Sequence, residues 1–238
     1  MNAITKNPLL RVVALLWLCA AMLAGCSQEP TYRKAFIQLL QTRLIDKTNG
    51  TFPILTAEDK KLLGEDYAKQ YAVIEDFNRA LNDSVGAPAR QLMQRSSFNS
   101  IGGIMQRRDD LKTLQDGFAK LQVALDENLV KADAAHAAMK QPEDLKAVYD
   151  QAYAKAVSKP AEAFKEVFPE LKTLFASINK VVDFVDAHKD KIKVSGMMVE
   201  VQDPALHKQL SVILNEMNQA GTSLNAAQNK LLKTVRGQ

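Results

Sequence analysis

Apolar residues recur every three or four positions over long stretches of this 238-residue chain. The clearest stretch is a near-heptad seam that consists of Phe164, Phe168, Leu171, Phe175, Ile178, Val182 and Val185. Such spacing puts the apolar side chains on one face of a helix, whereas a strand would need strict alternation. Two further seams, around Leu121 and Leu210, have the same spacing. Three long amphipathic helices favour antiparallel packing, so we predict an all-α, elongated helical bundle.

Capping and turn residues divide the chain into predicted helices. Thr56 is an expected N-cap, and Asp203-Pro204 is a strong helix start. Gly86-Ala87-Pro88 and the pair Gly102-Gly103 are expected to interrupt helices. Pro169 lies inside a seam that stays in register, which predicts a kink and not a stop. The predicted helices cover residues 33–47, 57–82, 89–140 with a break near 96–103, 144–158, 159 to about 190, and 204 onward.

Residues 192–201 form the one stretch with strand character. Val194-Ser195-Gly196-Met197 is typical of a tight turn between two very short strands. An isolated hairpin is only marginally stable, so we expect this small β-hairpin to pack on the helices.

The first 25 residues have the features of a secretory signal peptide. Lys6 and Arg11 are the only charges, and an apolar run from Val12 to Ala24 follows. This run is shorter than the roughly 20 residues that a membrane-spanning helix needs. It ends in Leu23-Ala24-Gly25-Cys26, which resembles the bacterial lipobox. The resemblance implies that a signal peptidase recognises Leu23, Ala24 and Gly25, cleaves before Cys26, and that Cys26 carries lipid, palmitate included. The alternative is an ordinary signal peptide with a chance cysteine.

A lipid-bearing Cys26 predicts where the protein resides. Residues 26–32 would be the lipidated cysteine and a short tether, and residues 33–238 the helical domain. Several acyl chains anchor a protein stably to a membrane. Ser27 favours the outer membrane, because in enteric bacteria an Asp at this place implies retention in the inner membrane. We therefore expect a protein of the cell envelope that faces the periplasm. Cleavage removes Cys19, so Cys26 is the only cysteine left and no disulfide is expected.

Motifs of known catalytic centres are missing from the sequence. There is no Gly-x-Ser-x-Gly elbow, no His-Glu-x-x-His and no phosphate loop. Asp133 and His136 lie three residues apart on one helix face, which permits a hydrolase pair; a surface contact is the simpler interpretation. Metal sites need three or four ligands. We predict a non-enzymatic protein without metal or cofactor, and His188 is expected to interact with a helix dipole.

Charge and methionine content bear on partners. The net charge of +4 is small and mixed in sign, so nucleic acid is not an expected partner. Met197, Met198, Phe175 and Met217 are candidates for an apolar pocket, since methionine suits adaptable surfaces. This pocket supports a second hypothesis, a carrier of an apolar, lipid-like ligand. The simpler interpretation is that these methionines fill gaps where the hairpin meets the bundle.

Several segments resemble the YiaF-like lipoproteins of enteric bacteria, a family with a domain of unknown function. They are residues 33–37, 55–61, 131–141, 144–146 and 150–152, and the similarity is densest around 131–153. The resemblance implies an envelope location and a helical fold, and it transfers no catalytic residue. Our leading hypothesis is therefore a membrane-anchored lipoprotein with a structural or protein-interaction role, which contacts another envelope protein or the cell wall.

Overall fold

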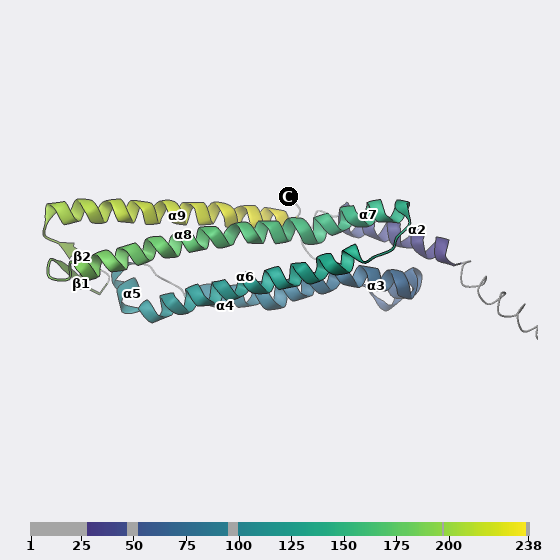
Figure 1. Cartoon of the computed structure of the whole chain (residues 1–238), viewed down its shortest axis with the longest axis horizontal. Coiled ribbons are helices and arrows are strands. Elements are labelled where there is room, and N and C mark those ends of the chain that lie inside the picture. Colours follow the sequence, from purple (N-terminus) through teal and green to yellow (C-terminus); the bar gives the residue numbers. More distant parts are fainter. Residues whose placement is uncertain (1–27, 47–51, 95–99, 197, 237–238) are drawn as a thin grey trace, which may run out of the picture.

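The computed structural model describes residues 28–46, 52–94, 100–196 and 198–236. They form an elongated bundle of antiparallel helices with one two-stranded sheet, which confirms the predicted fold (Figure 1). The α-helices are α2 (Glu29–Leu40), α3 (Ala57–Leu81), α4 (Ala87–Gln94), α5 (Ile101–Gln106), α6 (Arg108–Ala137), α7 (Glu143–Tyr153), α8 (Lys159–Ala187) and α9 (Pro204–Arg236). Three π-helical turns, η1 (Gln41–Ile45), η2 (Asn82–Gly86) and η3 (Ala154–Ser158), and the strands β1 (Ile192–Ser195) and β2 (Met198–Val201) complete the described elements.

The two ends of the bundle are built differently. Figure 1 shows the start of α2 and the connection between α6 and α7 at one end, and the hairpin β1–β2 at the other. Helices α8 and α9 lie side by side over most of the length of α9, while α3, α4 and α6 form the opposite layer. Buried apolar residues from α2, α3, α6, α7, α8 and α9 form one continuous core cluster. The long axis of the molecule therefore separates the N-terminal end from the hairpin end.

Helix α2 begins earlier than predicted. The sequence pattern started this helix at residue 33, whereas the structure starts it at Glu29, inside the expected tether. Pro30 in the first turn and the acidic Glu29 are both favourable at a helix N-terminus. The periodicity could not reveal these residues because the apolar stripe of α2 begins only later.

Two predicted breaks at prolines are wrong, because a π-helical turn precedes each of these prolines. Turn η2 ends at Gly86, two residues before Pro88, and turn η3 ends at Ser158, two residues before Pro160. A proline ring in an α-helix collides with the carbonyl four residues earlier, and a wider turn relieves that collision. Before Pro160 this carbonyl belongs to Ala156, and it accepts a hydrogen bond of 3.1 Å from Asn78 Nδ2 of α3. The chain therefore stays helical past both prolines, from Glu65 to Gln94 and from Glu143 to Ala187, while Gly64 interrupts α3 near its start.

The region around Gly102-Gly103 also differs from the expectation. The two glycines lie inside the short helix α5, whose N-cap Ser100 accepts a hydrogen bond from the amide of Gly103 at 3.0 Å. The break falls at Arg107, whose dihedrals of φ −122° and ψ 39° separate α5 from α6. Part of the predicted break, residues 95–99, lies outside the described residues. Helix α8 continues through Pro169, as the register of its seam predicts.

The hairpin and the start of α9 form where they were predicted. Strands β1 and β2 are antiparallel, and the register pairs Ile192 with Val201 and Ser195 with Met198. Gly196 has a φ of 59°, which suits its place in the tight turn. Asp203 Oδ1 accepts from the amide of Ala205 at 2.8 Å, so it caps α9 as expected.

The N-terminus of α3 is held by an ion pair between the buried Asp59 and the partly exposed Arg43. The hydroxyl of Thr56 accepts from the amide of Asp59, and a carboxylate oxygen of Asp59 accepts from the amide of Thr56, which completes a capping box. Arg43 donates to both carboxylate oxygens of Asp59, at 2.7 and 2.6 Å. Asp59 is only 5% exposed, and the hydrogen bonds from Arg43 and Thr56 lower its pKa to about 2.

This pair predicts a defined dependence of stability on pH. A carboxyl whose pKa is lower in the folded state stabilises the fold above its unfolded pKa, near 3.9, and loses that contribution as pH falls through its folded pKa. We expect Asp59→Asn to lower the free energy of unfolding by roughly 1–2 kcal/mol at pH 6. The deficit should shrink between pH 5 and pH 2. Urea unfolding of both proteins over this range measures it, and a deficit that stays constant down to pH 2 contradicts the assignment.

Candidate functional site

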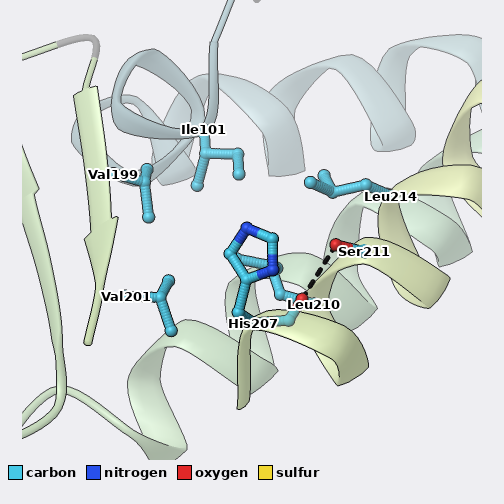
Figure 2. A pocket seen from close by; sticks show the side chains of 7 residues that line it. All are labelled: Ile101, Val199, Val201, His207, Leu210, Ser211 and Leu214. Carbon is cyan, nitrogen blue, oxygen red and sulfur yellow. Dashed lines mark hydrogen bonds between the residues drawn. The ribbon is translucent and has the colours of Figure 1, made fainter. Parts of the chain in front are cut away.

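A recess of about 270 Å³ lies at the hairpin end of the bundle. It is lined by side chains from α5, β2 and α9 (Figure 2), namely Ile101, Val199, Val201, His207, Leu210, Ser211 and Leu214. We call this recess the hairpin pocket.

Local structure places each lining group. Val199 and Val201 are two residues apart on β2, so their side chains lie on the same face of the hairpin. On α9, the lining residues follow positions i, i+3, i+4 and i+7 from His207, which is one helix face. Ile101 directly follows Ser100, the N-cap of α5. The pocket therefore exists only where a short helix, a strand and a long helix meet.

The hairpin pocket has mixed polarity, with five aliphatic and two polar side chains in its lining. Its two polar side chains are His207 and Ser211, and the Ser211 hydroxyl donates to the backbone oxygen of His207 at 2.8 Å. That bond stays within α9, so it does not form a pair between the hydroxyl and the imidazole. No carboxylate is among the lining residues. These groups suit the binding of an apolar side chain or ligand; they do not form an acid–base pair.

The sequence placed an apolar pocket elsewhere. Phe175 and Met217 are half-buried and pack against a small cluster of Ile104, Leu111 and Ile178. Met198 is 75% exposed on β2, and Met197 lies outside the described residues. None of the described three lines the hairpin pocket. The predicted pocket set stays a prediction, and the signal for the hairpin pocket was the spacing of Leu210 and Leu214 together with the alternating valines of the hairpin.

The pair of His136 and Asp133, which the sequence permitted as an alternative to a surface contact, has separate partners in the structure. His136 Nε2 lies 2.8 Å from Asp150 Oδ1 of α7, whereas Asp133 accepts a hydrogen bond of 2.7 Å from the hydroxyl of Tyr153. The two predicted partners thus contact different residues of α7. The segment 131–153, where the family resemblance is densest, contains all four of these residues, but the resemblance did not show which of them pair.

Around His136 the two helices form an aromatic corner. The imidazole stacks on the ring of Tyr153, with centroids 4.1 Å apart, and lies 5.4 Å from that of Tyr149. Burial raises the pKa of both tyrosines well above their usual range. Burial alone would also raise the pKa of Asp150, but hydrogen bonds from Lys146 and His136 bring it below its usual value. These contacts hold α6 against α7, so they stabilise the packing of the two helices.

Metal binding has no support in the part of the chain that the structure describes. It contains no group of three or more His, Cys, Asp or Glu residues arranged to hold a metal ion. His188 lies at the C-cap of α8, where the sequence placed it, with its Nδ1 2.8 Å from the backbone oxygen of Phe184.

The lipidation residues fall outside the described residues. Leu23, Ala24, Gly25 and Cys26 precede Gln28, where the description begins. Within the described ranges, no helix combines the length and the apolar content that crossing a membrane requires.

Comparisons with known proteins point to one family. Residues 12–232 match the family described as "Protein of unknown function (DUF3053)". The chain is 31% identical over 172 residues to "Uncharacterized protein YiaF" of Escherichia coli strain K12, which covers 71% of each chain. The protein with the same name from Shigella flexneri has the same identity and coverage. No solved structure matches the chain.

Proposed function

Because the chain belongs to the DUF3053 family, whose function is unknown, we propose its function from its own residues. The protein is a lipid-anchored, non-enzymatic lipoprotein of the bacterial cell envelope. It holds an elongated helical bundle in the periplasm, with the outer membrane as the favoured site of the anchor, and it binds a protein partner at the hairpin end.

The observation that carries the proposal is the placement of the two ends. The described part of the chain starts at Gln28, two residues after Cys26. Helix α2 begins at the end of the bundle opposite the hairpin (Figure 1). The helical run from Glu143 to Ala187 is by itself about 65 Å long at roughly 1.5 Å per residue. An anchor at Cys26 would therefore hold the hairpin pocket far from the membrane, where it can meet a partner in the periplasm.

The hairpin pocket is small and lies at the lower edge of the volumes that small-ligand sites have. Pockets for small ligands usually measure about 300–1,000 Å³. A recess of about 270 Å³ with five aliphatic side chains suits one or two apolar side chains that project from another protein.

A second candidate function is the carriage of an apolar ligand. The five aliphatic side chains of the hairpin pocket support it. Native mass spectrometry of the purified chain would then show a bound lipid-like mass, and Leu214→Glu should remove that mass.

Lipidation at Cys26 gives the first test. We expect intact-mass spectrometry of the membrane-extracted protein to show a chain cleaved before Cys26 that carries acyl chains. Cys26→Ser should abolish both the cleavage at this place and the acyl mass. Cys19→Ser is the matched control, and it should leave the lipidated mass of the mature chain unchanged because Cys19 lies in the signal peptide. A wild-type chain without acyl mass contradicts the proposal.

Partner binding is tested with a photo-crosslinker at Ser211 in living cells. We expect a discrete cross-linked product that is lost in Leu214→Glu, a change inside the hairpin pocket. Val212→Glu is the control, since Val212 is 54% exposed on the same helix and does not line the pocket. A product that persists in Leu214→Glu is evidence against binding at the hairpin pocket.

A further inference from the structure

We propose that the first turns of α3 form a second contact with the membrane, in which Leu62 enters the headgroup region of the bilayer beside Lys60 and Lys61. This inference rests on the lipid anchor at Cys26 proposed above. It specifies which end and which side of the anchored bundle face the membrane. A covalent lipid anchor together with a contact made by protein side chains holds a protein on a membrane more firmly than either does alone.

Contacts between α2 and α3 place Leu62 beside the start of the described chain. A Cβ atom on Gly64 would lie 2.9 Å from the ring of Tyr32, so the two residues touch. The Tyr32 hydroxyl donates to Gln28 Oε1 at 2.7 Å, and the Tyr67 hydroxyl donates to Glu29 Oε1 at 2.5 Å. Leu62 is therefore two residues away from a direct contact with the first turn of α2.

The length of chain between anchor and bundle keeps this region near the lipid. In the sequence, only Ser27 separates Cys26 from Gln28. Two peptide steps span at most about 7 Å. The headgroup region on each side of a bilayer is several ångströms deep, so an anchored chain would bring the first turn of α2 and its neighbours to that region.

The side chains around Leu62 combine one exposed apolar group with charges of both signs. Leu62 is 63% exposed, although the next residue, Leu63, is buried in the core. Lys60 and Lys61 are exposed on the same turns. Glu58 and Asp66, four residues before and after Leu62, are exposed as well. The nearby carboxylate of Glu65 is paired with Lys69 at 2.7 Å. The lysine stems lie along apolar surface while their ammonium groups stay in water, so Lys60 and Lys61 are compatible with a leucine side chain at the headgroup level.

The rigidity of this turn favours a defined contact. Asp59, three residues before Leu62, is locked by Arg43 and the capping box. Gly64, two residues after it, has φ 68° and ψ 171°, which interrupts the helix and changes its direction. Other exposed apolar side chains, such as Val130 on α6 and Val212 on α9, have no comparable contact with α2 among the bonds and ring contacts of the described residues.

A single tryptophan reports on the contact. The only tryptophan of the chain is Trp17, which cleavage before Cys26 removes. Leu62→Trp therefore gives a mature protein with one tryptophan. The lipidated variant is placed in vesicles of anionic lipid whose acyl chains carry bromine. Val212→Trp is the matched control, since Val212 is 54% exposed and lies near the hairpin end of α9.

We expect the tryptophan emission of the Leu62→Trp protein to shift to shorter wavelengths and to lose most of its intensity in these vesicles. The emission of the Val212→Trp protein should do neither. Adding Lys60→Glu and Lys61→Glu to the Leu62→Trp protein should restore much of the lost intensity. Circular dichroism checks that each variant is folded.

Flotation with the vesicles separates the failure of this inference from the failure of the anchor. If the lipidated protein floats with the vesicles but the Leu62→Trp and Val212→Trp proteins respond alike, the second contact is wrong and the anchor stands. If the protein does not float, both the anchor and this inference are overturned.

Discussion

Replacing Tyr149 with alanine is expected to lower the free energy of unfolding by about 3–5 kcal/mol, because the loss of a large buried ring leaves a cavity. Tyr149 is fully buried, and its ring lies 6.1 Å from that of Phe36 on α2 and 5.4 Å from that of His136 on α6. Its hydroxyl donates to the backbone oxygen of Gln70 on α3 at 2.7 Å. One side chain of α7 thus contacts three other helices at the N-terminal end of the bundle.

The conservative variant Tyr149→Phe separates packing from hydrogen bonding. It keeps the ring and removes only the bond to Gln70, so we expect a loss of about 1 kcal/mol. Urea unfolding followed by far-ultraviolet circular dichroism measures both variants. If Tyr149→Ala unfolds at the same urea concentration as Tyr149→Phe, the ring does not hold the four helices together.

Gly64→Ala is expected to destabilise the protein by roughly 1–3 kcal/mol. The dihedrals of Gly64, φ 68° and ψ 171°, lie in a region that is almost exclusive to glycine. A Cβ atom at this position would also lie 2.9 Å from the ring of Tyr32, so α2 would have to move. Both effects act at the corner where α3 changes direction beside α2.

A second glycine supplies the control. Gly221 lies inside α9 without a positive φ, and a Cβ atom there would meet nothing within 4 Å. Gly221→Ala should raise the free energy of unfolding by about 0.5–1 kcal/mol, because alanine loses less conformational freedom in a helix. Thermal unfolding of the two variants checks the opposite signs. Equal shifts in the same direction would show that Gly64 is an ordinary helical glycine.

Errors at two helix boundaries have a common cause. The sequence pattern ended helices before Pro88 and Pro160, although η2 and η3 carry the helix past both prolines. The carbonyl of Ala156 that η3 displaces is satisfied by Asn78, which is 78 residues away in sequence. A π-helical turn is common to both prolines, and the contact of Ala156 with Asn78 that accompanies η3 has no local signal in the sequence. The early start of α2 is a different case, since Pro30 was a local signal that the periodicity outweighed.

Candidate sites were harder to predict than helices. The spacing of Asp133 and His136 correctly placed both on α6, but their partners, Tyr153 and Asp150, come from α7. The hairpin pocket needs α5 in contact with β2 and α9, and α5 lies more than 90 residues before these two elements in the sequence. Methionines were predicted to line a pocket because their side chains suit adaptable apolar surfaces, but Met198 is exposed in the structure.

What the sequence by itself determined is the local part of this protein. Apolar periodicity, the caps at Thr56 and Asp203 and the turn at Gly196 specify long helices and a hairpin, because each depends on residues only a few positions apart. Only the tertiary structure decided which helices meet, where the hairpin pocket lies, and that Asp150 is the partner of His136. These features depend on how separate elements pack against one another, and the residue spacing within one element does not specify that packing.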